Sequence, residues 1–166
     1  DAAASTPVDL TGGSATNLTL SRTTTAGEVL DGVASFKIVK TANNSQGQGA
    51  SCLFNVPPVA QGKLCQARIP YKAISGTLVT GDITLWIYDV TNSVLITPLA
   101  QNIDQSSGTV NAYFTPSLSA GTPANQQYRI RIYFGSVSAL AQTLVFDDVR
   151  VGPVDSVYGP NISGWT

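Results

Sequence analysis

Five residues on two stretches of the chain combine planar aromatic rings with guanidinium groups. Trp86 and Tyr88 alternate with aliphatic residues in one stretch, and Arg129, Arg131 and Tyr133 alternate with apolar residues in another. Alternate residues of an extended chain share a face, so the five side chains form one platform if the two stretches are neighbours in a sheet. Such a platform suits a protein partner and also a sugar ring. A third interpretation is that these side chains only cover one layer of the fold.

The adjacent carboxylates Asp147 and Asp148 are a second candidate site, in the stretch Thr143 to Val151. Strict alternation in a strand points one of them inward, where an unpaired charge costs on the order of several kcal/mol. A calcium ion, which takes oxygen ligands, would compensate for that charge. The alternative is that Asp147 accepts backbone N–H groups from a neighbouring loop while Asp148 faces solvent.

The composition argues against most enzyme and nucleic-acid functions. The 166 residues are 43% hydrophobic and 11% charged, with a net charge of −1, no His and nine basic residues. Without His, the many Ser residues have no base of the usual kind, and the scattered Lys and Arg do not form a phosphate-binding cluster. No apolar run approaches the roughly 18 residues of a membrane span. We therefore expect no enzyme, no nucleic-acid partner and no membrane, with glycan hydrolysis by a carboxylate pair as a minor alternative.

Two cysteines, Cys52 and Cys65, lie thirteen residues apart on consecutive expected strands. They form either a disulfide or two buried thiols that behave as small hydrophobic residues. Two cysteines without His cannot complete a four-ligand zinc site.

Short alternating stretches separated by turn residues predict an all-β chain. Thr and Val suit strands, while Gly, Asn, Ser and Pro suit turns. Eight or nine strands at this spacing are typical of an antiparallel β-sandwich. The expected strands are 17–21, 33–39, 51–56, 64–73, 82–90, 94–97, 109–115, 127–135 and 143–151.

The chain divides into three parts on composition. Residues 1–30 are an N-terminal arm or first-strand region, 31–152 are the sandwich domain, and 153–166 are a linker or tail with a Pro near each end. Because the sequence begins at Asp1 without an initiator Met and ends abruptly at Thr166, we expect a processed chain or a piece of a longer one.

Between Phe36 and Pro153 the chain resembles a known family. The matching stretches are FKIVK, LFNVPPVAQGKLCQARIPYKA, DITLWIYDVTNSVLITP, YRIRIYF and TLVFDDVRVGP. They are similar to the jelly-roll domains, themselves like carbohydrate-binding modules, of bacteriophage tail-fibre, capsid-fibre and decoration proteins. The resemblance covers about 120 of the 166 residues, and its motifs are patterns of order and spacing.

This resemblance implies a jelly roll, a virion location, a non-catalytic structural role and the first Asp of the 147–148 pair as a calcium ligand. The chain departs from the family in one respect, because its first thirty residues lack the opening Asn-Gly-Phe-Glu-like strand that helps to hold calcium. We therefore expect a virion structural protein that decorates a capsid or forms part of a tail or fibre. Its expected partners are other virion proteins in a homo-oligomer or multi-copy assembly, together with host-surface glycan. The alternative is a carbohydrate-binding module of a secreted or cell-surface protein.

Overall fold

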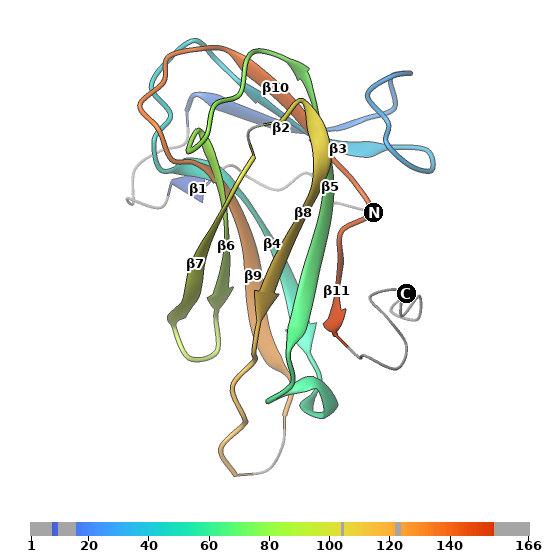
Figure 1. The fold of residues 1–166 in the computed structure, drawn as a ribbon, viewed down its shortest axis with the longest axis vertical. Helices are drawn as coiled ribbons and strands as arrows, with labels where there is room; N and C mark the ends of the chain where they lie inside the picture. Colours follow the sequence, from blue (N-terminus) through green and yellow to red (C-terminus); the bar gives the residue numbers. More distant parts are fainter. Residues whose placement is uncertain (1–7, 10–15, 104, 122–123, 155–166) are drawn as a thin grey trace.

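The computed structural model is a β-sandwich of two antiparallel sheets (Figure 1). It describes residues 8–9, 16–103, 105–121 and 124–154, without the side chains of 8–9 and 97–102. Sheet A has the order β1 (Val8–Asp9), β4 (Gln48–Val56), β9 (Gln126–Phe134), β6 (Ile83–Asp89) and β7 (Val94–Asn102). No helix in the described part of the chain is long and apolar enough to cross a membrane.

Sheet B is built around its longest strand, β5 (Cys65–Ser75). One edge of β5 pairs with β8 (Ser107–Phe114). The other edge pairs first with β11 (Arg150–Pro153) and then with β10 (Gln142–Phe146), which leads to β3 (Ser35–Lys40) and β2 (Leu18–Thr23). The last two strands therefore follow each other along one edge of β5, and residues 147–149 join them.

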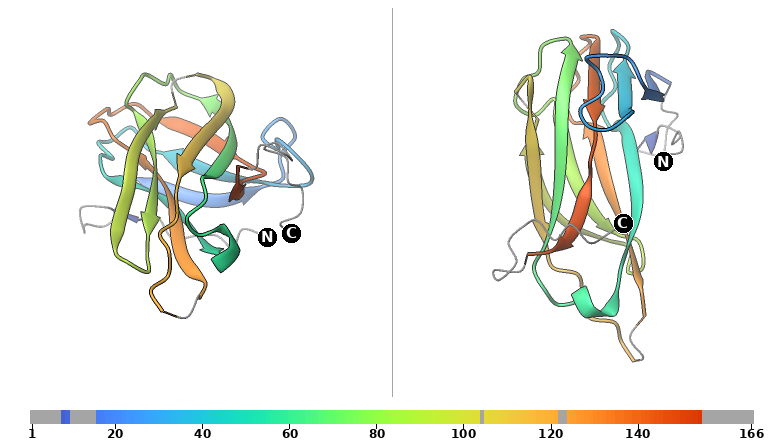
Figure 2. Two further views of the ribbon diagram at one scale, coloured as in Figure 1. Left: turned by 60° about the horizontal axis from the view of Figure 1, so that its bottom comes forward. Right: turned by 90° about the vertical axis from the view of Figure 1, so that its right-hand side faces the viewer.

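The core lies between the sheets because inward positions are apolar on both. Strand β9 alternates strictly, with Tyr128, Ile130, Ile132 and Phe134 buried, and β5 buries Cys65, Ala67, Ile69 and Tyr71. One end is filled by rings of Phe54, Phe114 and Tyr128, whose centroids are 5.8–6.0 Å apart. The predicted two-sheet antiparallel sandwich of jelly-roll type is confirmed, and its two layers are visible in Figure 2.

Several predicted strand bounds were wrong. The expected short strand 94–97 continues to Asn102, and β4 begins at Gln48, inside the expected loop. The expected strand 143–151 is two strands, because residues 147–149 are not in strand conformation and separate β10 from β11. Strand β2, within the region 1–30, pairs with β3 at the edge of sheet B. Most of the expected tail, residues 155–166, lies outside the described residues.

Candidate functional site

The five predicted platform residues do come together, on the outward side of sheet A. Strands β6 and β9 are neighbours, and their register sets Trp86 opposite Arg131 and Tyr88 opposite Arg129. Tyr133 lies opposite Thr84, one step further along the same face. We call these residues (Trp86, Tyr88, Arg129, Arg131 and Tyr133) the arginine face.

The arginine face is packed into itself. The Arg131 guanidinium carbon lies 4.0 Å from the centroid of the Tyr88 ring, which places the cation over the aromatic face. The rings of Trp86 and Tyr133 meet edge to face at 4.4 Å, and Arg129 Nη1 donates to Ser51 Oγ at 3.4 Å. All five side chains are half-buried. Burial lowers the pKa of Arg131 and raises the pKa of Tyr133, so both charged forms are penalised. The Tyr88 ring is therefore covered, and less aromatic surface is free for a sugar than the pattern predicts.

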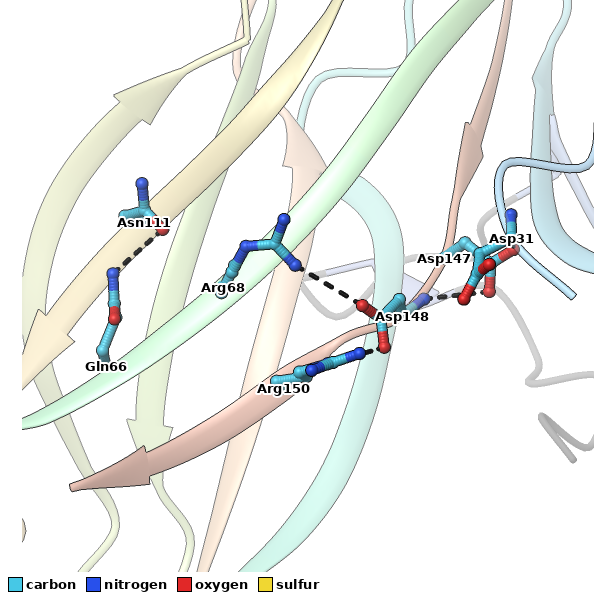
Figure 3. Close-up of polar contacts among 7 residues, drawn as sticks. All are labelled: Asp31, Gln66, Arg68, Asn111, Asp147, Asp148 and Arg150. Carbon is cyan, nitrogen blue, oxygen red and sulfur yellow. Dashed lines mark hydrogen bonds and ion pairs between the residues drawn. The ribbon is translucent and has the colours of Figure 1, made fainter. Parts of the chain in front are cut away.

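A second outward face, on sheet B, was missed from the sequence. Strands β5 and β8 set Gln66 opposite Tyr113 and Arg68 opposite Asn111. The Gln66 amide donates to Asn111 Oδ1 at 3.0 Å and to the Tyr113 hydroxyl at 3.1 Å, and Figure 3 shows Gln66 and Asn111 meeting across the two strands. We call Gln66, Arg68, Asn111 and Tyr113 the amide–tyrosine face.

The amide–tyrosine face is more open than the arginine face. Tyr113 is 43% exposed, so its ring and hydroxyl reach solvent. A sequence signal existed, since polar and apolar residues alternate in both stretches. However, only the pairing of β5 with β8, which the sequence does not reveal, brings the four polar side chains together.

The Asp147-Asp148 pair lies at the break between β10 and β11, so the expectation of a strand interior with one inward carboxylate was wrong. Asp148 has a positive φ of 44°, which ends the strict alternation. Its carboxylate accepts from Arg68 Nη1 at 3.4 Å and from Arg150 Nε at 2.8 Å, as Figure 3 shows. Asp148 is therefore the shared counter-ion of two arginines and not a free solvated group.

Asp147 ties the β2–β3 connection, which extends away from the sandwich in Figure 1, to the end of β10. Its Oδ2 accepts from the Asp31 N–H at 3.1 Å and from Ser35 Oγ at 2.7 Å, and its Oδ1 accepts from the Asp148 N–H at 2.9 Å. These contacts match the alternative in which Asp147 accepts backbone N–H groups from a neighbouring loop.

Calcium coordination by Asp147 and Asp148 stays a prediction. Calcium takes six to eight oxygen ligands, whereas both carboxylates already accept from N–H or O–H donors. Among the described residues no group of three or more His, Cys, Asp or Glu side chains could hold a metal ion. The described side chains alone thus do not make up a calcium ligand set.

The two cysteines are both free, so the disulfide considered from the sequence is not formed. Cys52 lies on β4 of sheet A and is exposed, whereas Cys65 lies on β5 of sheet B and is buried. The strands β4 and β5 are thus consecutive in the chain but belong to opposite sheets. Only Cys65 behaves as the buried, hydrophobic thiol of the second alternative.

A cavity of about 810 Å³ opens between the two sheets beside β3 and β4. Its floor includes the core residues Ile69, Ile130 and Phe146, and its rim carries the exposed side chains of Val33 and Leu53. The lining is mainly apolar but also includes Arg22, Asp31, Ser35, Asp147 and Asp148. The carboxylates of Asp147 and Asp148 already accept from donors within the protein.

Known structures share this fold. A family 4 carbohydrate-binding module aligns with a TM-score of 0.58 and 15% identity, over 89% of this chain and 84% of its own. The xylan-binding family 22 module of Xyn10C from Paenibacillus barcinonensis aligns with a TM-score of 0.54 and 13% identity, over 92% of each chain. The C-terminal family 22 module of Clostridium thermocellum Xyn10B aligns with a TM-score of 0.51 and 12% identity, over 92% of this chain and 96% of its own.

The fold is similar to that of carbohydrate-binding modules. At these identities the likeness concerns the fold alone. The sequence itself matches no protein-family profile and no curated relative.

Proposed function

We propose that the chain is a non-catalytic carbohydrate-binding module of a secreted or cell-surface protein, and that the amide–tyrosine face holds the glycan. The observation that carries the proposal is the bridge from one amide, Gln66, to Asn111 and to the exposed Tyr113. A ring with an apolar body and a polar tip packs on a sugar. A small number of fixed polar groups then orients the sugar hydroxyls.

The hydrogen bonds within this face support its role as a prepared surface. Because Gln66 donates to both partners, the side chains of Asn111 and Tyr113 are held before any ligand arrives. Such preorganisation lowers the entropy lost on binding. Similar structures include a module whose name states that it binds xylan, which supports a polysaccharide ligand.

The local charge favours a neutral glycan at this face. Arg68 and Arg150 share the Asp148 carboxylate at 3.4 Å and 2.8 Å. The cation nearest to the amides is therefore compensated within the protein, and the guanidinium N–H groups that remain free can donate to hydroxyl groups.

The proposal is tested by affinity electrophoresis against neutral polysaccharides such as xylan and mixed-linkage β-glucan, with wild type and Tyr113→Ala. We expect the Tyr113→Ala variant to bind at least about tenfold more weakly, since it loses the ring and the hydroxyl that accepts from Gln66. Tyr88→Ala, on the opposite sheet, is the matched aromatic control and is expected to bind like wild type. Loss in Tyr88→Ala alone would move the site to the arginine face, and no binding by wild type would reject the function.

The virion role implied by the family resemblance receives no support from the similar structures, which are carbohydrate-binding modules. The alternative named with it, a module of a secreted or cell-surface protein, fits them better. For the same reason we propose a glycan as partner in place of other virion proteins.

A further inference from the structure

The arginine face carries two positive charges and no negative one. Outward positions on β4, β6 and β9 hold Gly, Ser, Leu, Asn, Thr, Gln, Trp and Tyr besides Arg129 and Arg131. The two arginines are therefore the only charged side chains among the described residues at these positions. They are two residues apart on one strand, roughly 7 Å along the chain.

Neither guanidinium is neutralised by a described residue. Arg131 makes no hydrogen bond or ion pair with the described part of the chain, and its guanidinium carbon lies 4.0 Å from the centroid of the Tyr88 ring. Arg129 reaches only the neutral hydroxyl of Ser51. By contrast, Arg68 and Arg150 on sheet B share Asp148, and Lys37 pairs with Glu28 at 2.6 Å.

This arrangement is unfavourable until an anion arrives. Like charges at neighbouring positions of a sheet repel each other, and the half-burial of both side chains reduces their solvation. The contact with the Tyr88 ring restrains the Arg131 guanidinium, and its planar set of N–H donors makes no hydrogen bond with the described residues. A fixed guanidinium fork matches the two oxygens of a carboxylate or a sulfate.

We propose that the arginine face is a second binding site, for an anionic polysaccharide that carries carboxylate or sulfate groups. The site shares no residue with the amide–tyrosine face and does not depend on it. The half-buried rings of Trp86 and Tyr133, which meet edge to face, lie on the same face as the two cations, so the charged groups and not the covered Tyr88 ring carry the recognition. Nucleic acid is a poorer fit, because its dense phosphates call for clustered basic residues, whereas this chain has a net charge of −1.

The test uses pairs of polysaccharides that differ only in charge. Polygalacturonate is compared with its fully methyl-esterified form, and dextran sulfate with dextran, by titration calorimetry at low ionic strength with duplex DNA as a further comparator. The wild type is expected to bind at least one charged polymer, at least about tenfold more tightly than its uncharged counterpart. The first pair reports on carboxylate and the second on sulfate. Added salt should weaken this binding.

Variants connect the binding to the two arginines. The double variant Arg129→Gln and Arg131→Gln should lose at least about tenfold in affinity. Arg131→Lys keeps the charge but not the planar guanidinium, so its affinity should lie between that of the double variant and that of wild type. Lys63→Gln is the control: it removes one charge from an exposed turn residue and should bind like wild type. Circular dichroism and the unfolding midpoint establish that each variant is folded.

Four results would overturn the proposal: no binding to any charged polymer, equal binding to the charged and uncharged members of a pair, tighter binding to DNA, or an equal loss in Lys63→Gln. Tyr113→Ala separates this proposal from that of the neutral-glycan site. It should leave the anionic binding unchanged even if the neutral glycan is no longer bound or was never bound.

Discussion

Cys52 and Cys65 differ in accessibility in a way that a thiol reagent can report. Cys65 is 1% exposed in the core, whereas Cys52 is exposed on β4. In native protein at about pH 8, iodoacetamide should modify Cys52, and Cys65 should react only after guanidinium chloride is added. Peptide mass spectrometry locates the label, and Cys52→Ser should remove the native reaction. A mass two hydrogens lower without reductant, and no labelling after unfolding, would show a disulfide instead.

Burial of Cys65 also makes stability depend on pH. It raises the pKa of the Cys65 thiol to about 11, above the value of about 8.5 in an unfolded chain. As the pH rises, the thiol of the unfolded chain therefore loses its proton first. The contribution of the buried thiol to the free energy of unfolding is complete below about pH 8.5 and is lost as the pH rises toward 11. Urea unfolding should show a fall of roughly 2 kcal/mol from this group over that range. Cys65→Ala should show a shallower fall, and identical slopes for the two proteins would contradict the account.

At the scale of the strands, alternation was enough to predict which side chains face outward. The pattern in β6 and β9 correctly separated Trp86 and Arg131 from the core. It could not predict that Arg131 would cover the Tyr88 ring, since that contact depends on which strands pair and on their register. The buried Lys40, whose ammonium donates to the Ser138 and Leu140 carbonyls, was equally invisible because those carbonyls come from a distant loop.

Asp147 and Asp148 show a second limit of pattern reading. Their sequence continues an alternating stretch, and only the positive φ at Asp148 reveals that the strand stops there. A backbone turn of this kind does not change the hydrophobic periodicity of the sequence, so the pattern cannot predict it. The tertiary contacts of Asp147 with Asp31 and Ser35, more than 100 residues away, decide where its carboxylate points.

The pairing of β4 with β9 depends on one glycine. Gly49 lies opposite Tyr133, and a Cβ at this position would collide with the Ile132 carbonyl and lie 2.6 Å from the Tyr133 Cα. Because both obstacles are backbone, Gly49→Ala should destabilise the protein by about 1–3 kcal/mol or more, measured by urea unfolding. Gly108→Ala in β8 is the matched control, since its nearest contact is the Tyr71 hydroxyl at 3.3 Å, and it should cost clearly less. Equal losses in the two variants would contradict a specific role for the β4–β9 contact.

At the scale of the whole molecule, the sandwich holds its two proposed sites on opposite sides. The arginine face lies on the outward side of sheet A, and the amide–tyrosine face on the outward side of sheet B. Packed sheets are about 10 Å apart, so ligands on the two outer surfaces do not collide. The charges also differ, because Arg68 is compensated by Asp148 whereas Arg131 has no described carboxylate partner. One molecule should therefore join two different polysaccharides.

A capture assay measures this bridging directly. Protein bound to an immobilised neutral glycan should retain soluble, labelled polygalacturonate or dextran sulfate, whichever binds in the calorimetric test. Tyr113→Ala should strongly reduce capture of the protein itself, in line with its weaker binding to the neutral glycan. The double variant Arg129→Gln and Arg131→Gln should be captured normally but should retain no label, because its amide–tyrosine face is intact. If the charged polymer instead releases the protein from the neutral glycan, the two ligands compete for one surface. The arrangement of independent faces on opposite sheets would then be wrong, even though each ligand binds alone.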